Sequence, residues 1–162
     1  MISSLIIADY ILGTSDKQLT HMQINRLAYI SHGFTLALEN EPLFSDGVQA
    51  WKYGPIIPSI YHVLKRYRDS PVPALGYCGT LLENAKERLN FINSVIPDNH
   101  KSVIKEVLSV YGGFSGLGLS TITHEKGSPW EQCYDPNWFS ISIPDDITKE
   151  YYRMQLQYLP PT

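Results

Sequence analysis

The stretch VQAWKYGPIIPSIY, residues 48–61, carries the strongest backbone constraints in the chain. Gly54 can take the positive φ values that other residues avoid, whereas Pro55 and Pro58 each fix φ at about −65° and donate no backbone hydrogen bond. Residues that precede proline are pushed toward extended conformations, so neither Gly54 nor Ile57 is expected in a helix. The stretch therefore predicts a short extended segment, a rigid corner and a new helix that begins near Pro58.

The residues upstream of this corner give the clearest helix signal. Thr20 and Gln23 match a T-x-x-Q capping box, and Leu19 stands where it can pack against Ile24 as a hydrophobic staple. A cap of this kind contributes about 1 kcal/mol. The helix is expected to end near Asn40. Its apolar face is expected to contain Ile24, Leu27, Ala28, Phe34 and Leu38, interrupted by Ser31.

Helical periodicity continues on both sides of this region. A first helix is expected over residues 4–12, with Gly13 as its stop, and the helix after Pro58 is expected to bury Ile60, Val63, Leu64 and Tyr67. The apolar stripe Leu82, Ala85, Leu89, Ile92 and Ile96 predicts a later helix, and a second is expected between a cap at Asp98 and a stop at Gly112. Residues 117–124 predict a short helix, and Ser128-Pro129 with Glu131 predicts the start of another. A last helix is expected after Pro144, with Ile147, Tyr151, Met154 and Tyr158 on its apolar face.

Two segments favour strands. Asp46-Gly47 is a turn signal between Leu43-Phe44 and residues 48–51, and it predicts a small two-stranded element. Residues 140–143 are a further candidate strand, and residues 69–80, with two Pro and two Gly, predict a loop. The chain is therefore expected to form one domain over residues 1–162, mostly α with minor β. We expect a compact helical bundle with one or two short strands or a small hairpin.

Composition excludes several classes of protein. The net charge of −3 argues against a global attraction to nucleic acid or to an anionic membrane. No apolar run approaches the roughly 20 residues that span a bilayer, and the N-terminal residues 1–13 carry Asp9 and lack the basic start of a signal peptide. Cys78 and Cys133 lie far apart, which predicts two structural thiols in a reducing cytoplasm.

Catalytic and cofactor motifs are absent from the sequence. None of the five histidines has metal-ligand spacing to another histidine or to a cysteine, so neither a metal nor a cofactor is predicted. His124-Glu125 suggests a base with its carboxylate, but neighbouring helical residues point about 100° apart, which favours a structural hydrogen bond for His124. The glycine-rich segment 112–116 lacks the Gly-Lys-Ser/Thr that grips a nucleotide.

Exposed aromatic and basic residues are the remaining candidates. Trp51, Tyr53 and Trp130 each lie beside Pro or Gly in a non-helical corner, where they either anchor an interface or seal the core. The only dense basic cluster, residues 65–68, places Tyr67 inward and Lys65, Arg66 and Arg68 outward on the helix pattern. That face is either solvated, or it meets an acidic protein surface or nucleic acid.

Three motifs together resemble the Panacea domain of SocA-like antitoxins and phage-associated proteins. They occur in the family's order and cover most of the chain. The matching residues are 24–34 for the LQKLLYF-like helix motif, Ala50, Trp51, Gly54 and Pro55 for A-W-x-x-G-P, followed by Tyr61, and Leu119, Ser120, Thr123, His124, Pro129 and Trp130 for L-S-x-x-T-H…P-W. Asn25-Arg26 stand where Gln-Lys is typical, and we expect them on the polar side of the helix.

The resemblance implies a cytoplasmic antitoxin that binds and neutralises a cognate protein toxin by direct contact, without catalysis. Some relatives work as proteolytic adaptors, which would add a protease or its unfoldase as a partner, and a homodimer is compatible with this reading. The residues predicted to bind the partner or to form the motifs are Trp51, Tyr53, Gly54, Pro55, Tyr61, Arg66, Arg68, Thr123, His124, Pro129 and Trp130. The alternatives are a small hydrolase that uses His124 and Glu125, and a nucleic-acid-binding regulator that uses residues 65–68.

Overall fold

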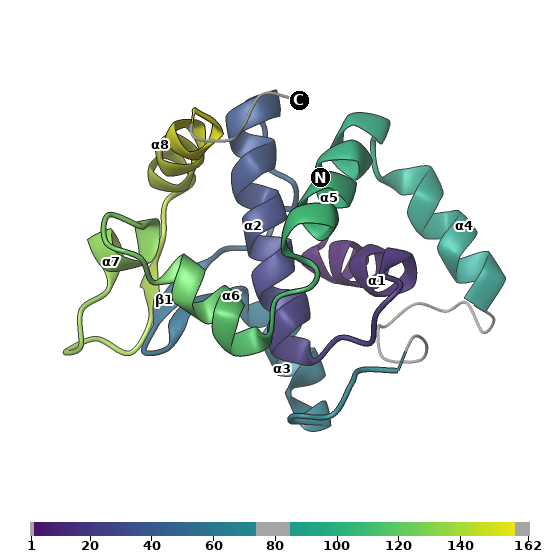
Figure 1. Ribbon diagram of the computed structural model, residues 1–162, viewed down its shortest axis with the longest axis horizontal. Coiled ribbons are helices and arrows are strands. Elements are labelled where there is room, and N and C mark those ends of the chain that lie inside the picture. The colour runs from purple at the N-terminus through teal and green to yellow at the C-terminus, as the bar shows by residue number, and fades with distance from the viewer. Residues whose placement is uncertain (1, 74–84, 158–162) are drawn as a thin grey trace.

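One long helix, α2 (His21–Glu39), runs through the middle of the structure (Figure 1). In the computed structural model, which describes residues 2–73 and 85–157, α2 contacts helices on every side as well as the sheet. The predicted capping box is confirmed, because the Thr20 hydroxyl accepts from the Gln23 amide while the Gln23 side chain accepts from the Thr20 amide. Asn40, with φ of 57°, ends the helix as predicted.

The central position of α2 overturns the expectation that it has a polar side. Asn25 and Arg26 are 0% and 1% exposed, so they lie in the core and not on a solvated face. Leu38, predicted to be buried, is 54% exposed because it lies near the end of the helix, beyond most of its neighbours. An amphipathic stripe describes a surface helix and fails for a helix that is covered all round.

Three of the helices that contact α2 are α1 (Ser4–Thr14), α3 (Pro58–Leu64) and α5 (Asp98–Tyr111), whereas α4 (Ala85–Val95) packs against α1. The start of α3 at Pro58 is confirmed, and a 3₁₀ turn, η1 (Lys65–Tyr67), extends it. Gly13 does not stop α1, which runs on to Thr14.

Helices α4 and α5 also depart from the predictions. Asp98 is the first residue of α5 and not its cap, since Pro97 holds the cap position, while Gly112 ends α5 as expected. On α4, Ile92 is buried as predicted but Leu89 is 37% exposed. Its place is taken by Arg88, whose guanidinium binds the buried carboxylate of Asp9 on α1 at 2.7 Å. The predicted positions Cys78, Leu82 and Tyr158 lie outside the described residues.

The C-terminal third contributes α6 (Gly116–Thr123), α7 (Pro129–Cys133) and α8 (Asp145–Leu156). Ser128 caps α7 as predicted, its hydroxyl accepting from the Glu131 amide. The inward face of α8 is shifted from the prediction, because Thr148 and Tyr152 are buried while Met154 is 48% exposed. The shift follows from packing: the Tyr152 ring fills the space beside Gly33 of α2, where a Cβ atom would collide with it.

The sheet has three short antiparallel strands in the order β2-β1-β3: β1 (Gln49–Trp51), β2 (Gly54–Ile56) and β3 (Ile141–Ser142). The strand predicted at residues 140–143 is confirmed as β3. The predicted turn at Asp46-Gly47 is wrong as a hairpin, since the two-residue turn falls at Lys52-Tyr53 and Trp51 pairs with Gly54. The Asp46 carboxylate instead accepts from the Ser4 amide at the start of α1.

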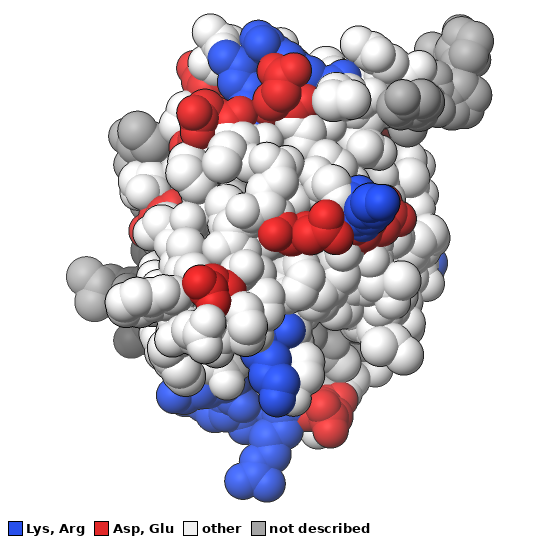
Figure 2. Space-filling view, turned by 90° about the vertical axis from the view of Figure 1, so that its left-hand side faces the viewer, with Lys and Arg blue, Asp and Glu red and all other residues white. Residues whose placement is uncertain are grey.

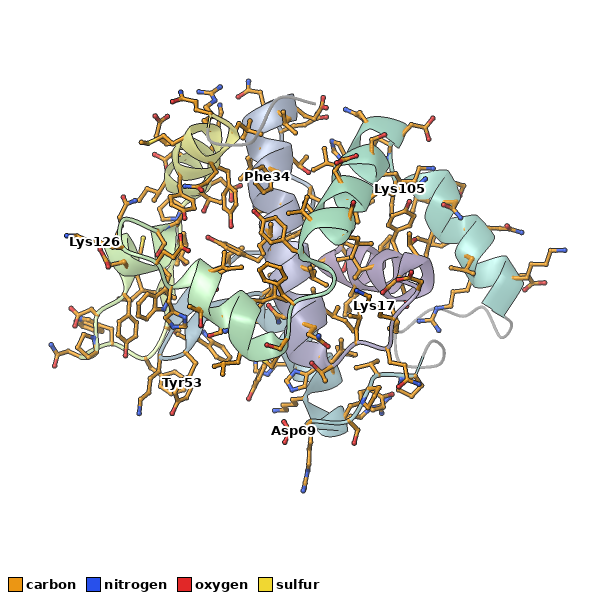
Figure 3. All side chains as sticks on the ribbon, in the orientation of Figure 1. Lys17, Phe34, Tyr53, Asp69, Lys105 and Lys126 are labelled. Atoms are coloured by element: carbon orange, nitrogen blue, oxygen red, sulfur yellow. The ribbon has the colours of Figure 1, made fainter. Side chains whose placement is uncertain are left out.

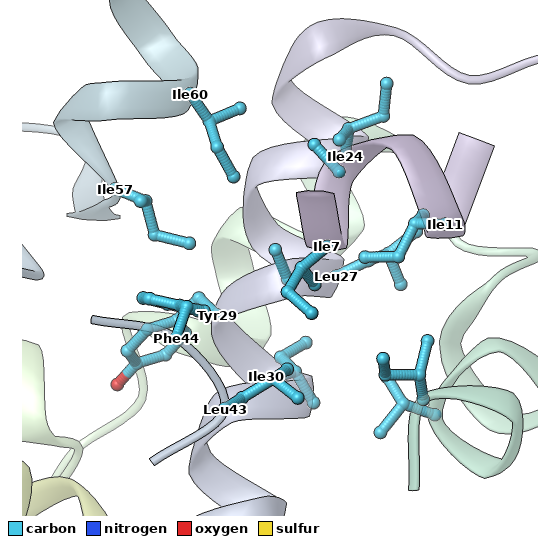
Figure 4. Packing of buried hydrophobic residues seen from close by; sticks show 14 of the residues in the cluster. Ile7, Ile11, Ile24, Leu27, Tyr29, Ile30, Leu43, Phe44, Ile57 and Ile60 are labelled. Carbon is cyan, nitrogen blue, oxygen red and sulfur yellow. The ribbon is translucent and has the colours of Figure 1, made fainter. Parts of the chain in front are cut away.

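The hydrophobic core lies where α1, α2 and α3 meet (Figure 4). Leu43 and Phe44, expected in a strand, contribute to this core from the segment before β1. The labelled members in the figure are Ile7, Ile11, Ile24, Leu27, Tyr29, Ile30, Leu43, Phe44, Ile57 and Ile60. The fold is therefore mostly α with minor β, as predicted. Within the described ranges, no helix has the length and apolar character needed to cross a membrane.

Candidate functional site

The hairpin between β1 and β2 requires glycine at position 54. Gly54 has φ of +124°, directly after the Lys52-Tyr53 turn, which confirms the predicted positive φ. A Cβ atom at this position would lie 2.9 Å from Cε1 of His124 and 3.0 Å from Nη2 of Arg26. Both the backbone conformation and the close approach of two side chains therefore exclude larger residues.

Arg26 reaches from α2 into the back of this hairpin. Its Nη2 donates to the Tyr53 carbonyl oxygen and its Nη1 donates to the Pro55 carbonyl oxygen, each at 2.7 Å. Among the described residues, no carboxylate lies within ion-pair distance of Arg26, so backbone carbonyl dipoles stabilise the charge. Burial lowers the pKa of Arg26 to about 10, which leaves the guanidinium protonated at neutral pH.

Asn25, the neighbour of Arg26, fixes the other end of β2. Its amide oxygen accepts from the Ile57 backbone N–H at 3.0 Å, and its amide nitrogen donates to the Ile57 carbonyl at 3.1 Å. Two consecutive residues of α2 therefore bind three backbone positions of the segment 53–57. Because both side chains are buried, they set the position of the hairpin from within the core.

The third motif binds the same hairpin. The indole Nε1 of Trp130 donates to the Trp51 carbonyl at 2.6 Å, and the Ser120 hydroxyl donates to the Tyr53 carbonyl at 3.2 Å. His124 packs its ring against Trp130, with centroids 4.3 Å apart, and its Nδ1 lies 2.6 Å from the Ser120 backbone oxygen. The three motifs are therefore brought together around one turn.

Several predicted site residues have structural positions. Thr123 is 3% exposed and donates its hydroxyl to the Leu119 carbonyl, and Pro129 is buried at the start of α7. Glu125 lies close enough to Tyr151 to help raise the pKa of its hydroxyl, and among the described residues no hydrogen bond or ion pair joins Glu125 to the ring of His124. The arrangement therefore assigns His124 to holding Ser120 and Trp130 beside the hairpin.

In front of the hairpin lies a groove of about 920 Å³, which we call the aromatic groove. It separates the turn and α3 from the loop 134–139, and Tyr53 points away from the body of the molecule at its edge (Figure 3). Its lining residues are His21, Met22, Trp51, Lys52, Tyr53, Ile56, Tyr61, Tyr134, Pro136, Asn137, Trp138 and Phe139.

Aromatic side chains dominate this groove. Trp51 is the centre, with its ring centroid 5.0 Å from that of Tyr61 and 6.4 Å from that of Phe139. Three of the aromatic side chains are largely solvent-exposed: Tyr53 by 70%, Trp138 by 67% and Phe139 by 90%. Exposed large aromatic side chains gathered around a concave surface are typical of interaction sites.

The sequence analysis missed Trp138 and Phe139. The available signal was the placement of two adjacent aromatic residues directly after Asp135-Pro136-Asn137, a run of turn-forming residues in which neither a helix nor a strand would bury them. Trp51, Tyr53 and Tyr61 were predicted as site residues, and all three line the groove.

Two lysines lie at the edge of the groove. Lys52 lies over the Tyr53 ring at 5.4 Å and Lys65 over the Tyr61 ring at 5.9 Å. Among the groove residues that the structure describes, none carries a carboxylate. Figure 2, which views the molecule from the side of α7 and the hairpin, shows Lys and Arg side chains gathered at the lower end of this face, next to a broad area with few charges.

Arg66 and Arg68, both predicted as site residues, lie outside the aromatic groove. The Arg66 guanidinium stacks on the Tyr67 ring and donates to its hydroxyl at 3.0 Å. Arg68 follows η1 with φ of 50° and is exposed. Of the nearby cations, Lys52 lines the groove, and Lys65 lies over the ring of Tyr61, which lines it.

In the described part of the chain, no cluster of three or more His, Cys, Asp or Glu side chains has an arrangement that could hold a metal ion. Cys133 has a free, half-buried thiol, and burial raises its pKa. This thiol is therefore protonated at neutral pH and is a poor nucleophile.

Comparison with known proteins places the sequence in a family. The sequence model described as "Antitoxin SocA-like, Panacea domain" matches residues 24–131, two-thirds of the chain. The chain belongs to this family. The antitoxin SocA of Caulobacter vibrioides (strain NA1000 / CB15N) is 25% identical over 146 residues, which cover 86% of this chain and 75% of that protein. No solved structure matches the chain.

The match to the SocA-like antitoxin family covers only part of the candidate site. The matched segment contains Arg26, Gly54, His124 and Trp130, which hold the hairpin, whereas Trp138 and Phe139 lie beyond it. The family supports an antitoxin role, which suggests a non-enzymatic protein with a toxin as partner.

Proposed function

We propose that this Panacea-domain protein binds its cognate toxin in the aromatic groove and neutralises it by direct protein–protein contact. The observation that carries the proposal is the exposure of Tyr53, Trp138 and Phe139 around one groove in a chain of the SocA-like antitoxin family. Trp and Tyr are the residues that most often dominate the binding energy of an interface. We expect this encounter to take place in the cytoplasm.

The clamped hairpin supports this proposal energetically. Four donors, from Arg26, Ser120 and Trp130, hold the carbonyl oxygens of Trp51, Tyr53 and Pro55. A turn that is already ordered loses little conformational entropy when it binds. Tyr53 is therefore presented to a partner at a low entropic cost.

The hydrolase alternative has less support from the geometry. A general base needs an orienting carboxylate or another partner within hydrogen-bond reach. Glu125, the partner suggested by the sequence, lies near Tyr151, while Nδ1 of His124 lies 2.6 Å from the Ser120 backbone oxygen. Direct neutralisation requires no catalytic residue. The same residues then serve to hold the binding surface in place.

A co-expression assay tests the proposal. The product of the neighbouring open reading frame would be expressed alone, to show toxicity, and then together with wild-type protein, with Tyr53→Ser/Trp138→Ser, or with Phe114→Ser. Phe114 is a matched control because it is 41% exposed and does not line the aromatic groove. We expect rescue by the wild type and the control, and loss of rescue by the double variant at equal protein levels.

Two results would contradict this function. Full rescue by the folded double variant would remove the groove from neutralisation. Rescue that requires a host protease, with no complex formed between the purified proteins, would replace direct contact by proteolytic delivery.

A further inference from the structure

The aromatic groove combines an apolar floor with two lysines at its edge. Lys52 and Lys65 each lie over a tyrosine ring, and among the described residues neither has a carboxylate within ion-pair distance. His21, which also lines the groove, has its pKa lowered by burial, so it is neutral at pH 7. The positive charge of the groove therefore comes from the two lysines.

The geometry points to the chemistry of the partner: we propose that the aromatic groove binds a segment of the toxin in which acidic residues alternate with large apolar or aromatic residues. This inference rests on the proposed function. Apolar side chains would cover Trp51 and the two rings beside it, Tyr61 and Phe139. Carboxylates of the same segment would then reach Lys52 and Lys65 on the rim.

Charge complementarity selects this occupant over a basic or neutral segment. A basic segment would face two lysines at a groove whose described lining offers no carboxylate in return. A neutral apolar segment would cover the aromatic floor but would bury lysine ammonium groups without partners, which is costly. An acidic apolar segment avoids both the repulsion between like charges and the burial of unpaired ammonium groups. It accounts for both the aromatic floor and the lysines on the rim.

Single-stranded nucleic acid is the other ligand that stacks on aromatic residues and pairs with cations. Two lysines at the groove neutralise few phosphates, and the whole chain carries a net charge of −3. Binding to nucleic acid depends on the number of phosphates neutralised and is lost with added salt. The observations therefore favour an acidic polypeptide segment.

Peptide binding tests the inference without knowledge of the toxin. The probes are a fluorescent peptide of alternating Glu and Trp or Leu, the same peptide with Lys in place of Glu, the same peptide with Ser in place of Trp and Leu, and an oligothymidylate of similar length. Fluorescence anisotropy at physiological salt gives their affinities for the full-length protein. We expect the acidic apolar peptide to bind at least about tenfold more tightly than each of the other three.

The site is then located by two further measurements. The chain has three tryptophans, so ¹H–¹⁵N spectra give three indole signals, and we expect those of Trp51 and Trp138 to move more than that of the inward-facing Trp130. Lys52→Glu/Lys65→Glu should weaken binding of the acidic peptide by about tenfold or more. Lys86→Glu/Lys105→Glu, on α4 and α5 at the other side of the molecule, should change it by less than about twofold.

The outcomes separate this inference from the proposed function. Equal or better binding of the basic peptide or of the oligothymidylate, or no binding of the acidic peptide, overturns the inference even if groove variants lose rescue. Tight binding of the acidic peptide together with full rescue by Tyr53→Ser/Trp138→Ser keeps the peptide specificity and overturns the role of the groove in neutralisation.

Discussion

The guanidinium of Arg26, which is 1% exposed, donates a 2.7 Å hydrogen bond to the carbonyl oxygen of Tyr53, whose side chain is 70% exposed. One buried cation thus connects the central helix to an exposed aromatic residue of the hairpin turn. The same guanidinium holds Pro55, on the other side of Gly54. The position of the exposed aromatic side chain is therefore set by the core.

Replacing Arg26 tests this connection. Arg26→Met keeps much of the side-chain volume but leaves the buried Pro55 carbonyl oxygen without its donor and the Tyr53 carbonyl with the Ser120 hydroxyl alone, so we expect a loss of about 2–4 kcal/mol in the free energy of unfolding. Urea denaturation measures this loss. Arg153→Met, at an exposed position on α8, is the control and should stay close to wild type. A loss no larger for Arg26→Met than for the control would show that the guanidinium does not hold the hairpin.

Two glycines in the same region make a matched pair. Gly54→Ala places a Cβ at positive φ and within 3.0 Å of Arg26, so we expect a destabilisation of about 1–3 kcal/mol. Gly47→Ala has no atom within 4 Å of its new Cβ, and we expect at most about 0.5 kcal/mol. Thermal unfolding of both variants compares them directly. Similar stabilities for the two variants would contradict the steric role of Gly54.

Replacement of His124 distinguishes a structural role of this residue from a catalytic one. His124→Ala removes the ring that packs on Trp130 and binds the Ser120 backbone, so we expect a lower melting temperature. Neutralisation of the toxin should fall only in proportion to the folded fraction, measured by circular dichroism at the assay temperature. A turnover activity that disappears in a fully folded His124→Ala protein would support the hydrolase alternative.

Alkaline pH is expected to destabilise the fold through its buried tyrosines. Burial raises the pKa of Tyr152 well above the usual value, and burial together with the nearby Glu125 raises that of Tyr151 to about 12. The unfolded chain releases these protons near pH 10, so their contribution is complete below about pH 10 and is lost as the pH rises toward 12. Arg26, with a lowered pKa, acts in the opposite direction but is a single group.

Urea midpoints across this range check the alkaline prediction. The midpoint should fall above about pH 10, and Tyr152→Phe should reduce the slope of that fall because it removes one of the groups responsible. An unchanged midpoint up to about pH 12, or the same slope in the variant, would contradict the assignment to these tyrosines.

Local chemistry predicted the parts of the fold that depend on few residues. The capping box of Thr20 and Gln23 and the positive φ of Gly54 follow from the preferences of those residues alone. Asn25 and Arg26 were misplaced because their burial depends on helices and strands distant in the sequence that cover α2 on all sides.

The sequence also predicted only part of the candidate site. Trp51, Tyr53 and Tyr61 stand beside the Gly-Pro corner, and all three line the groove. Trp138 and Phe139 were missed because aromatic residues are usually buried, and only the tertiary structure shows them facing the hairpin. Arg66 and Arg68 were assigned to the site from charge alone, which does not indicate the direction of a flexible side chain.

The affinity of the purified protein for the purified toxin, compared between Tyr53→Ser and Phe114→Ser, tests the central claim most directly. Isothermal titration calorimetry at one salt concentration, with circular dichroism to show that both variants are folded, gives the two dissociation constants. If the aromatic groove is the toxin-binding surface, Tyr53→Ser raises the dissociation constant by about tenfold or more, while Phe114→Ser stays within about twofold of wild type. Equal dissociation constants for wild type and a folded Tyr53→Ser protein would contradict the claim.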